Sequence, residues 1–172
     1  NLSGDLPPNT TYWQQVGLST NTQYGPHKVR AFNVGGSSDS SVRSRYTRAA
    51  PPLGLTAAEI HVTSVTLSWQ PSSNPPWTTW ILDKSTFAPI SGFPHVLVSS
   101  GPTTFTVTGL SPATSYYFEV YANSGDGIAT ARSKLSAVIT RADGPLLKTW
   151  VGQGLTQHSS EAANWSPPLS PE

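Results

Sequence analysis

The sequence has no cysteine and few charged residues: these make up 11% of its 172 residues and give a formal net charge of +1. The absence of cysteine excludes disulfide bridges, cysteine-based metal sites and thiol catalysis. The near-neutral charge gives no electrostatic basis for binding nucleic acid. No apolar run approaches the roughly eighteen residues that a membrane-spanning helix needs. We therefore expect neither a nucleic-acid partner nor a membrane span.

Long amphipathic helical patterns are also missing, because proline, glycine or β-branched residues interrupt each candidate within two turns. Apolar and polar residues alternate instead. In "SVTLSWQP", Val65, Leu67 and Trp69 face one way, and Thr66 and Ser68 face the other. Similar short segments recur at roughly ten-residue spacing and are separated by turns such as "PSSNPP" and "NSGDG". This pattern predicts an all-β, antiparallel β-sandwich.

An internal repeat organises the chain. The segment "LSTNTQY" at 18–24 matches "LSPATSY" at 110–116 in spacing, 92 positions further on. The two copies also end alike, with "YTRAAPPL" at 46–53 and "ITRADGPL" at 139–146. A period of this length corresponds to one whole β-sandwich domain, so the repeat predicts tandem sandwiches.

The stretch from about Pro52 to Arg141 resembles a fibronectin type III domain. The resemblance rests on "VTLSW", on Trp80 where the third strand usually has tyrosine, on "TVTGLSPATSYYFEVYA" and on the Gly-bearing turn "NSGDG". It implies an immunoglobulin-like sandwich of seven strands in two sheets. The expected strands are A at 53–58, B at 62–69, C at 78–83, C′ at 95–99, E at 104–107, F at 116–123 and G at 134–140.

The resemblance and the alternation together indicate which side chains fill the space between the sheets. We expect Tyr116 to hold the turn between strands E and F, the E–F corner, through its hydroxyl group. The expected structural core consists of Trp69, Trp80, Phe105, Leu110, Tyr116, Phe118 and Val120.

Three units are expected along the chain. Residues 1–50 align with strands E, F and G alone and form a partial fibronectin type III-like unit, in which Trp13 stands for Phe105. Residues 51–142 form a complete domain, and residues 143–172 begin a further β unit with candidate donor strands. The first ten residues are too few and too polar to supply strands A, B and C. Three strands of a sandwich expose an apolar face and open edges.

Two interpretations of this partial unit compete. In one, the chain is a window from a longer array, and the missing strands lie in the parent protein. In the other, the C-terminal segment of one subunit completes the first unit of the next by strand complementation. Such a head-to-tail contact propagates into a filament. The expected intersubunit interface consists of Trp13, Leu18, Tyr24, Val29, Leu147, Trp150, Val151 and Trp165.

Charge favours complementation weakly, since residues 1–50 carry five basic and two acidic side chains, and residues 143–172 carry one basic and three acidic ones. Two observations oppose it. The segment "SSEAANW" lacks the β-branched residues of "TSVTLSW", and no strand C is supplied. The C-terminal segment also resembles the W-x-G…NW openings of repeats in bacterial exported surface proteins, which would adopt a different fold.

No catalytic or metal-binding constellation stands out. The four histidines are scattered, serine never occurs in a G-x-S-x-G elbow, and carboxylates such as Asp83 and Glu119 fall singly on strands or loops. We expect no catalytic residue, no cofactor and no metal. The basic run "VRSRYTR" places Arg43 and Arg45 on one face of a strand, which we interpret as solvated. Trp77 is the candidate for stacking on a sugar.

These observations predict a non-enzymatic, extracellular structural or adhesive protein, secreted or at the cell surface and of a bacterial type. Its expected partners are other copies of itself, head to tail, or neighbouring modules of the same chain, with carbohydrate as a further candidate. The alternative is a carbohydrate-binding or spacer module of a larger secreted enzyme. A catalytic domain is the least supported class.

Overall fold

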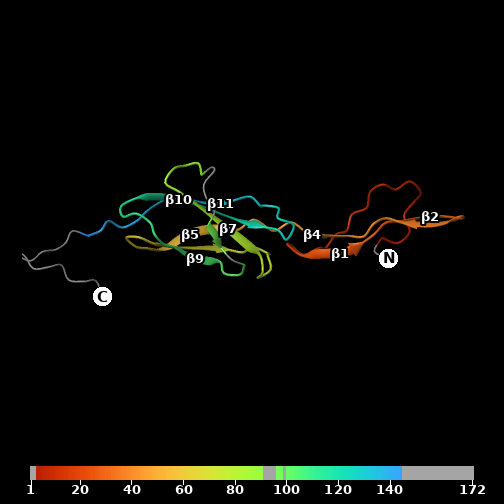
Figure 1. Cartoon of the computed structure of the whole chain (residues 1–172), viewed down its shortest axis with the longest axis horizontal. Coiled ribbons are helices and arrows are strands. Elements are labelled where there is room, and N and C mark those ends of the chain that lie inside the picture. Colours follow the sequence, from red (N-terminus) through yellow and green to blue (C-terminus); the bar gives the residue numbers. More distant parts are fainter. Residues whose placement is uncertain (1–2, 91–95, 99, 145–172) are drawn as a thin grey trace, which may run out of the picture.

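The computed structural model describes residues 3–90, 96–98 and 100–144, and in these residues it contains eleven strands and no helix. A hairpin and a sandwich follow one another along the long axis of the molecule (Figure 1). The hairpin holds β1 (Gln23–His27), β2 (Arg30–Asn33), β3 (Gly36–Asp39) and β4 (Arg43–Tyr46). The sandwich holds β5 (Leu53–Ile60), β6 (Val65–Gln70), β7 (Thr79–Ser85), β8 (Val96–Val98), β9 (Thr104–Val107), β10 (Ser115–Asn123) and β11 (Ser133–Ile139).

The sandwich, which we call the complete domain, consists of two antiparallel sheets. One sheet has the order β5-β6-β9 and the other the order β11-β10-β7-β8. Each of the seven strands predicted from the sequence overlaps one of these strands. The predicted fold class, an all-β antiparallel sandwich of the immunoglobulin type, is therefore confirmed.

The core of the complete domain lies between the two sheets and is built by period-2 alternation. On β6, the three apolar residues Val65, Leu67 and Trp69 are buried, and the residues between them are half-exposed. The rings of Trp69 and Trp80 meet edge to face, with centroids 6.0 Å apart. Of the expected core residues, Phe105 is half-buried against the cluster. The others are buried: Trp69, Trp80, Leu110, Tyr116, Phe118 and Val120.

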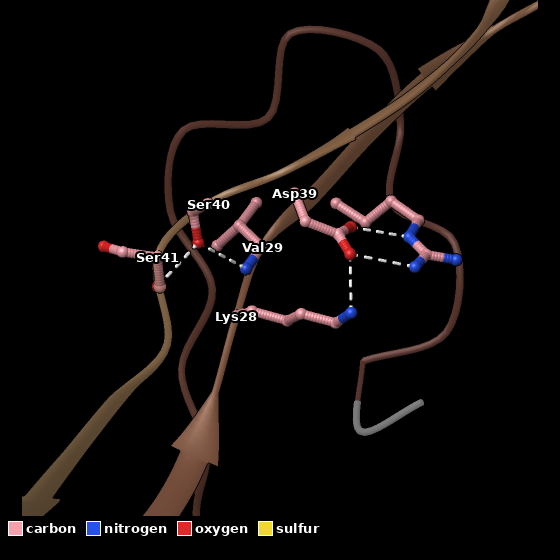
Figure 2. A network of polar contacts seen from close by, with 6 residues as sticks. Lys28, Val29, Asp39, Ser40 and Ser41 are labelled. Atoms are coloured by element: carbon pink, nitrogen blue, oxygen red, sulfur yellow. Dashed lines mark hydrogen bonds and ion pairs between the residues drawn. The ribbon is translucent and has the colours of Figure 1, made fainter.

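The N-terminal hairpin, which we define as residues 18–50, runs out and back in two paired sections, β1 with β4 and β2 with β3. Arg30 and Lys28 both donate to the carboxylate of Asp39, and Arg30 lies directly opposite Asp39 in the register (Figure 2). The backbone N–H of Val29 donates to the hydroxyl oxygen of Ser40 at 2.9 Å. These bonds hold the register of a hairpin that has little apolar packing of its own.

The expected strand E of the first unit is wrong in this structure. No strand forms over residues 3–22, which include Trp13. In the complete domain strand E is β9, and it is paired with strand B, β6, through Val107 and Val65. The first unit has no strand B among the described residues, so the segment around Trp13 has no neighbour with which to hydrogen-bond.

Candidate functional site

The E–F corner occurs twice in the structure with the same hydrogen bonds. In the complete domain, the Ser111 N–H donates to the hydroxyl oxygen of Tyr116 at 2.9 Å. In the N-terminal hairpin, the Ser19 N–H donates to the hydroxyl oxygen of Tyr24, also at 2.9 Å. The repeated sequence therefore folds into the same local structure in both places.

A threonine reproduces the rest of the corner. Thr47 donates its hydroxyl proton to the Ser19 carbonyl oxygen at 2.6 Å, as Thr140 does to the Ser111 carbonyl oxygen at 2.6 Å. Each threonine hydroxyl oxygen also accepts a backbone N–H at 3.0 Å, from Thr22 in the hairpin and from the matching residue of the complete domain. The corner is thus formed by local bonds and does not need a closed sandwich.

The surroundings of the two corners differ. Tyr116 and Leu110 are buried, but their counterparts Tyr24 and Leu18 are only half-buried. Trp13 is 42% exposed and Val29 is 74% exposed. These four residues are the described part of the expected intersubunit interface. Its other members, Leu147, Trp150, Val151 and Trp165, lie outside the described residues.

The hairpin also leaves a strand edge open. In the complete domain β10 pairs with β11 on one side and with β7 on the other, where Ala122 lies opposite Trp80. In the hairpin, β1 pairs with β4 and β2 with β3, and no third strand joins them among the described residues. The edge of β1 and β2 that corresponds to the β7 side therefore has no neighbouring strand. An open edge of this kind is a template for an additional strand.

Polar bonds dock the hairpin onto the loops of the complete domain. We call this contact the joint. The Asn21 side chain, 3% exposed, donates to the Thr78 hydroxyl oxygen at 3.0 Å and accepts the Gly125 N–H at 2.8 Å. The Asn74 side chain accepts the Ala50 N–H and donates to the Ala50 carbonyl oxygen, both at 2.7 Å. The buried side chain of Asn21 and the half-buried side chain of Asn74, with these partners, hold the hairpin and the complete domain in one orientation.

A ring packs against a glycine at the centre of the joint. The Tyr46 side chain lies so close to Gly125 that a Cβ atom there would come within 2.5 Å of the ring. The Tyr46 N–H donates to the Asp126 carboxylate at 3.0 Å. The sequence indicated a Gly-rich turn at 124–127 but gave no sign that this turn receives another part of the chain.

Two carboxylates that fall singly in the sequence meet in the structure. Glu119 and Asp83 lie directly opposite each other on β10 and β7, and both are buried. Arg132 pairs with both of them, and Lys134 binds Glu119 at 2.9 Å. The Arg132 guanidinium also lies 4.2 Å from the centroid of the Tyr121 ring.

The positive and negative charges of this cluster balance each other. Burial by itself lowers the pKa of Arg132, but the hydrogen bond and charge of Asp83 outweigh it, so that pKa lies above its ordinary value. Burial, and then the charge of Asp83, raise the pKa of Tyr121. Two cations therefore balance two carboxylates, which suits an ion-pair network that holds three strands together better than a general acid and base.

The remaining candidates are isolated. Trp77 is 62% exposed at the loop before β7. No group of three or more His, Cys, Asp or Glu side chains within residues 3–90, 96–98 and 100–144 is arranged to hold a metal ion. In the same part of the chain, no helix has the length and apolar character needed to cross a membrane.

The fold and its corner define the class of protein. A seven-stranded sandwich with this strand order and a tyrosine at the E–F corner is an immunoglobulin-like domain. Residues 50–138 match the family model described as fibronectin type III domain. The chain belongs to this family, whose domains are generally non-catalytic modules.

Two curated proteins and a solved structure are similar to the chain. Endoglucanase B of Cellulomonas fimi is 36% identical over 129 residues, which are 68% of this chain and 12% of that protein. Nephrin of Rattus norvegicus is 30% identical over 130 residues, 74% of this chain and 10% of that protein. The chain thus spans about a tenth of the length of these relatives. The chicken CNTN1 FN1–FN3 domains are 22% identical, covering 72% of this chain and 44% of theirs, with a TM-score of 0.48.

Proposed function

We propose that the chain is part of a non-enzymatic, extracellular structural protein, of the kind that bacteria secrete or display at the cell surface. Tandem fibronectin type III-like modules serve in it as a spacer or adhesive element. The N-terminal hairpin is the second half of such a module, and residues 143–172 of another copy complete it by strand complementation. Repetition of this contact gives a head-to-tail filament.

One observation carries the proposal. The hairpin forms the E–F corner of a sandwich bond for bond, yet Val29 remains exposed and, within the described residues, no second sheet covers the hairpin. A pair of strands with an apolar face is only marginally stable alone in water. The joint adds a second argument, because Asn21 and Asn74 hold the hairpin in line with the complete domain. A rigid series of modules suits a spacer.

The test is the state of association of the purified chain. Size-exclusion chromatography with light scattering and electron microscopy are expected to show concentration-dependent assembly and filaments. Deletion of residues 146–172 is expected to leave monomers, because the donor segment is gone. A full-length chain that stays monomeric at high concentration would sink the proposal. Filaments that persist after the deletion would show that another contact holds them.

A second candidate function has its own observation. Trp77 is 62% exposed, and aromatic rings presented in this way stack on sugar rings. The similarity to an endoglucanase is consistent with a carbohydrate-binding or spacer module of a larger secreted enzyme. Pull-down with insoluble cellulose tests this: Trp77→Ala should weaken retention, whereas Phe87→Ala, at a residue 70% exposed, serves as the matched control. Equal retention of both variants and the unchanged chain would remove this candidate.

A further inference from the structure

The inner face of the hairpin differs in one respect from the face it repeats. We define the inner face by comparison with the complete domain, where Tyr116 on β10 lies opposite Val138 on β11 and both side chains are buried in the core. In the hairpin, Tyr24 on β1 lies opposite Arg45 on β4. Arg45 therefore occupies the place of a core valine, and it is exposed.

The next pair along the strands shows the same change. In the complete domain Phe118 lies opposite Leu135, and in the hairpin His27 lies opposite Arg43. On this face β1 thus carries the rings of Tyr24 and His27, and β4 carries two guanidinium groups. An apolar sheet laid over this face would bury these charges without partners, which is strongly unfavourable. The strand that covers the face needs a carboxylate near Arg45.

The C-terminal segment offers a carboxylate at the matching position. Aligning "SSEAANW" with "TSVTLSW" places Trp165 at the position of Trp69 and Glu161 at the position of Val65. In the complete domain, Val65 and Val138 belong to the same core cluster.

Val65 and Val138 also lie at the same end of the complete domain. The Arg141 N–H donates to the His61 carbonyl oxygen at 3.1 Å there, which ties the end of β11 to the approach of β6. A glutamate at the position of Val65 would therefore lie in the facing sheet, at the same end of the core as an arginine at the position of Val138.

We infer that the inner face of the hairpin accepts residues 145–172 of a second copy of this chain, and that Glu161 of that copy pairs with Arg45. This inference rests on the strand complementation proposed above and adds the element that selects the donor. The net charges of the two ends are opposite, with Arg43 and Arg45 contributing to the positive one. The last described residues, drawn in blue, leave the complete domain at the end opposite the hairpin, and we therefore assign the segment that follows them to a second copy (Figure 1).

The experiment reverses the charges. Arg45→Glu and Glu161→Arg are each expected to raise the concentration needed for assembly about a hundredfold or more, because each leaves like charges facing each other. An equimolar mixture of the two variants is expected to assemble as the unchanged chain does, since each end then meets its opposite charge. The chain that carries both substitutions is expected to assemble alone.

Matched controls separate charge at this position from net charge. Arg48→Glu makes the same change beyond the end of β4, and Glu172→Arg makes it away from the aligned segment. Neither is expected to alter assembly by more than about twofold. Arg45→Val combined with Glu161→Val is a second test of the pairing, because it replaces both charges with the valines found at these positions in the complete domain. The double valine chain is expected to assemble, and Arg45→Val alone is not.

The outcomes distinguish this inference from the proposal beneath it. If the unchanged chain never assembles, strand complementation itself fails. If the unchanged chain assembles and Arg45→Glu assembles equally well while circular dichroism shows both folded, only the pairing of Arg45 with Glu161 is overturned. A mixture of the two charge variants that stays unassembled overturns the pairing as well. If the C-terminal segment instead completes the hairpin of its own chain, and Arg45→Glu abolishes this in a monomer, then the donor is not a second copy.

Discussion

The N-terminal hairpin and the complete domain contain the same corner in different surroundings. Ser19, Tyr24 and Thr47 make the bonds that Ser111, Tyr116 and Thr140 make, at matching distances. In the complete domain a second sheet covers these groups; in the hairpin, no second sheet formed by the described residues does. The comparison teaches that local bonds determine the shape of the corner, whereas burial depends on strands from elsewhere.

The largest expected difference between the two regions is in the loss of stability when a tryptophan is replaced by alanine. Trp80 is 1% exposed, and Trp80→Ala is expected to lower the free energy of unfolding of the complete domain by about 3–5 kcal/mol because it leaves a core cavity. Trp13→Ala removes a 42% exposed ring, and for the isolated chain we expect a change below about 0.5 kcal/mol. Urea unfolding followed by circular dichroism measures both. Equal losses would show that the first unit is already closed.

The next largest effect is expected from a substitution in the joint, which weakens docking of the hairpin. Gly125→Ala places a methyl group against the Tyr46 ring and is expected to weaken docking of the hairpin by about 1–3 kcal/mol. Hydrogen exchange at the Tyr46 amide, which is bonded to Asp126, is expected to accelerate accordingly. Gly144→Ala is the control, because a Cβ there meets nothing within 4 Å. Unchanged exchange at Tyr46 would mean that the joint tolerates the methyl group.

The hydroxyl groups of the two corners give a smaller effect. Tyr116→Phe leaves the Ser111 N–H without its acceptor in a partly buried place, and we expect a loss of about 1 kcal/mol in stability. Tyr24→Phe removes the same bond where water replaces it, so the expected loss is below about 0.5 kcal/mol. Thermal unfolding by calorimetry compares the variants. A larger loss for Tyr24→Phe would contradict the exposure of the hairpin corner.

The smallest effect depends on pH. The hydrogen bond from Arg30, then that from Lys28, holds the pKa of Asp39 well below its ordinary value. The pairing therefore contributes above about pH 4 and is lost as the pH falls further, because the folded hairpin binds its proton less readily than the unfolded one. Proton NMR is expected to show the hairpin losing order in acid while the complete domain keeps its structure. Asp39→Asn should remove this dependence, and a titration of Asp39 at its ordinary pKa would contradict it.

Alternation and the corner motif predicted most of the complete domain. Val65, Leu67 and Trp69 alternate with polar residues, and a period of two is unambiguous on a strand buried on one face. The proximity of the two carboxylates Asp83 and Glu119 was not predictable, because it depends on the register of two strands far apart in the sequence. We interpreted Arg45 as solvated for a related reason. Its correspondence to the core residue Val138 emerges only when the strand registers of the two regions are compared.

The first unit was predicted less well than the complete domain. Trp13 aligns with Phe105 of a strand, but a strand also needs a neighbour to pair with, and none lies beside Trp13 among the described residues. The joint was not foreseen either, because Asn21 and Gly125 look like ordinary turn residues in the sequence.

The joint also makes the order of the modules matter. Asn21 has Ala113 as its counterpart in the second corner, so the amide side chain that binds Thr78 and Gly125 is not repeated there. The hairpin half of the joint is therefore not duplicated, although the corner beside it is. A gene in which these units were shuffled would encode the same folds but lose their fixed alignment. The two units share a corner sequence, but they cannot exchange places, because only the first unit has the asparagine that binds the loops of the second.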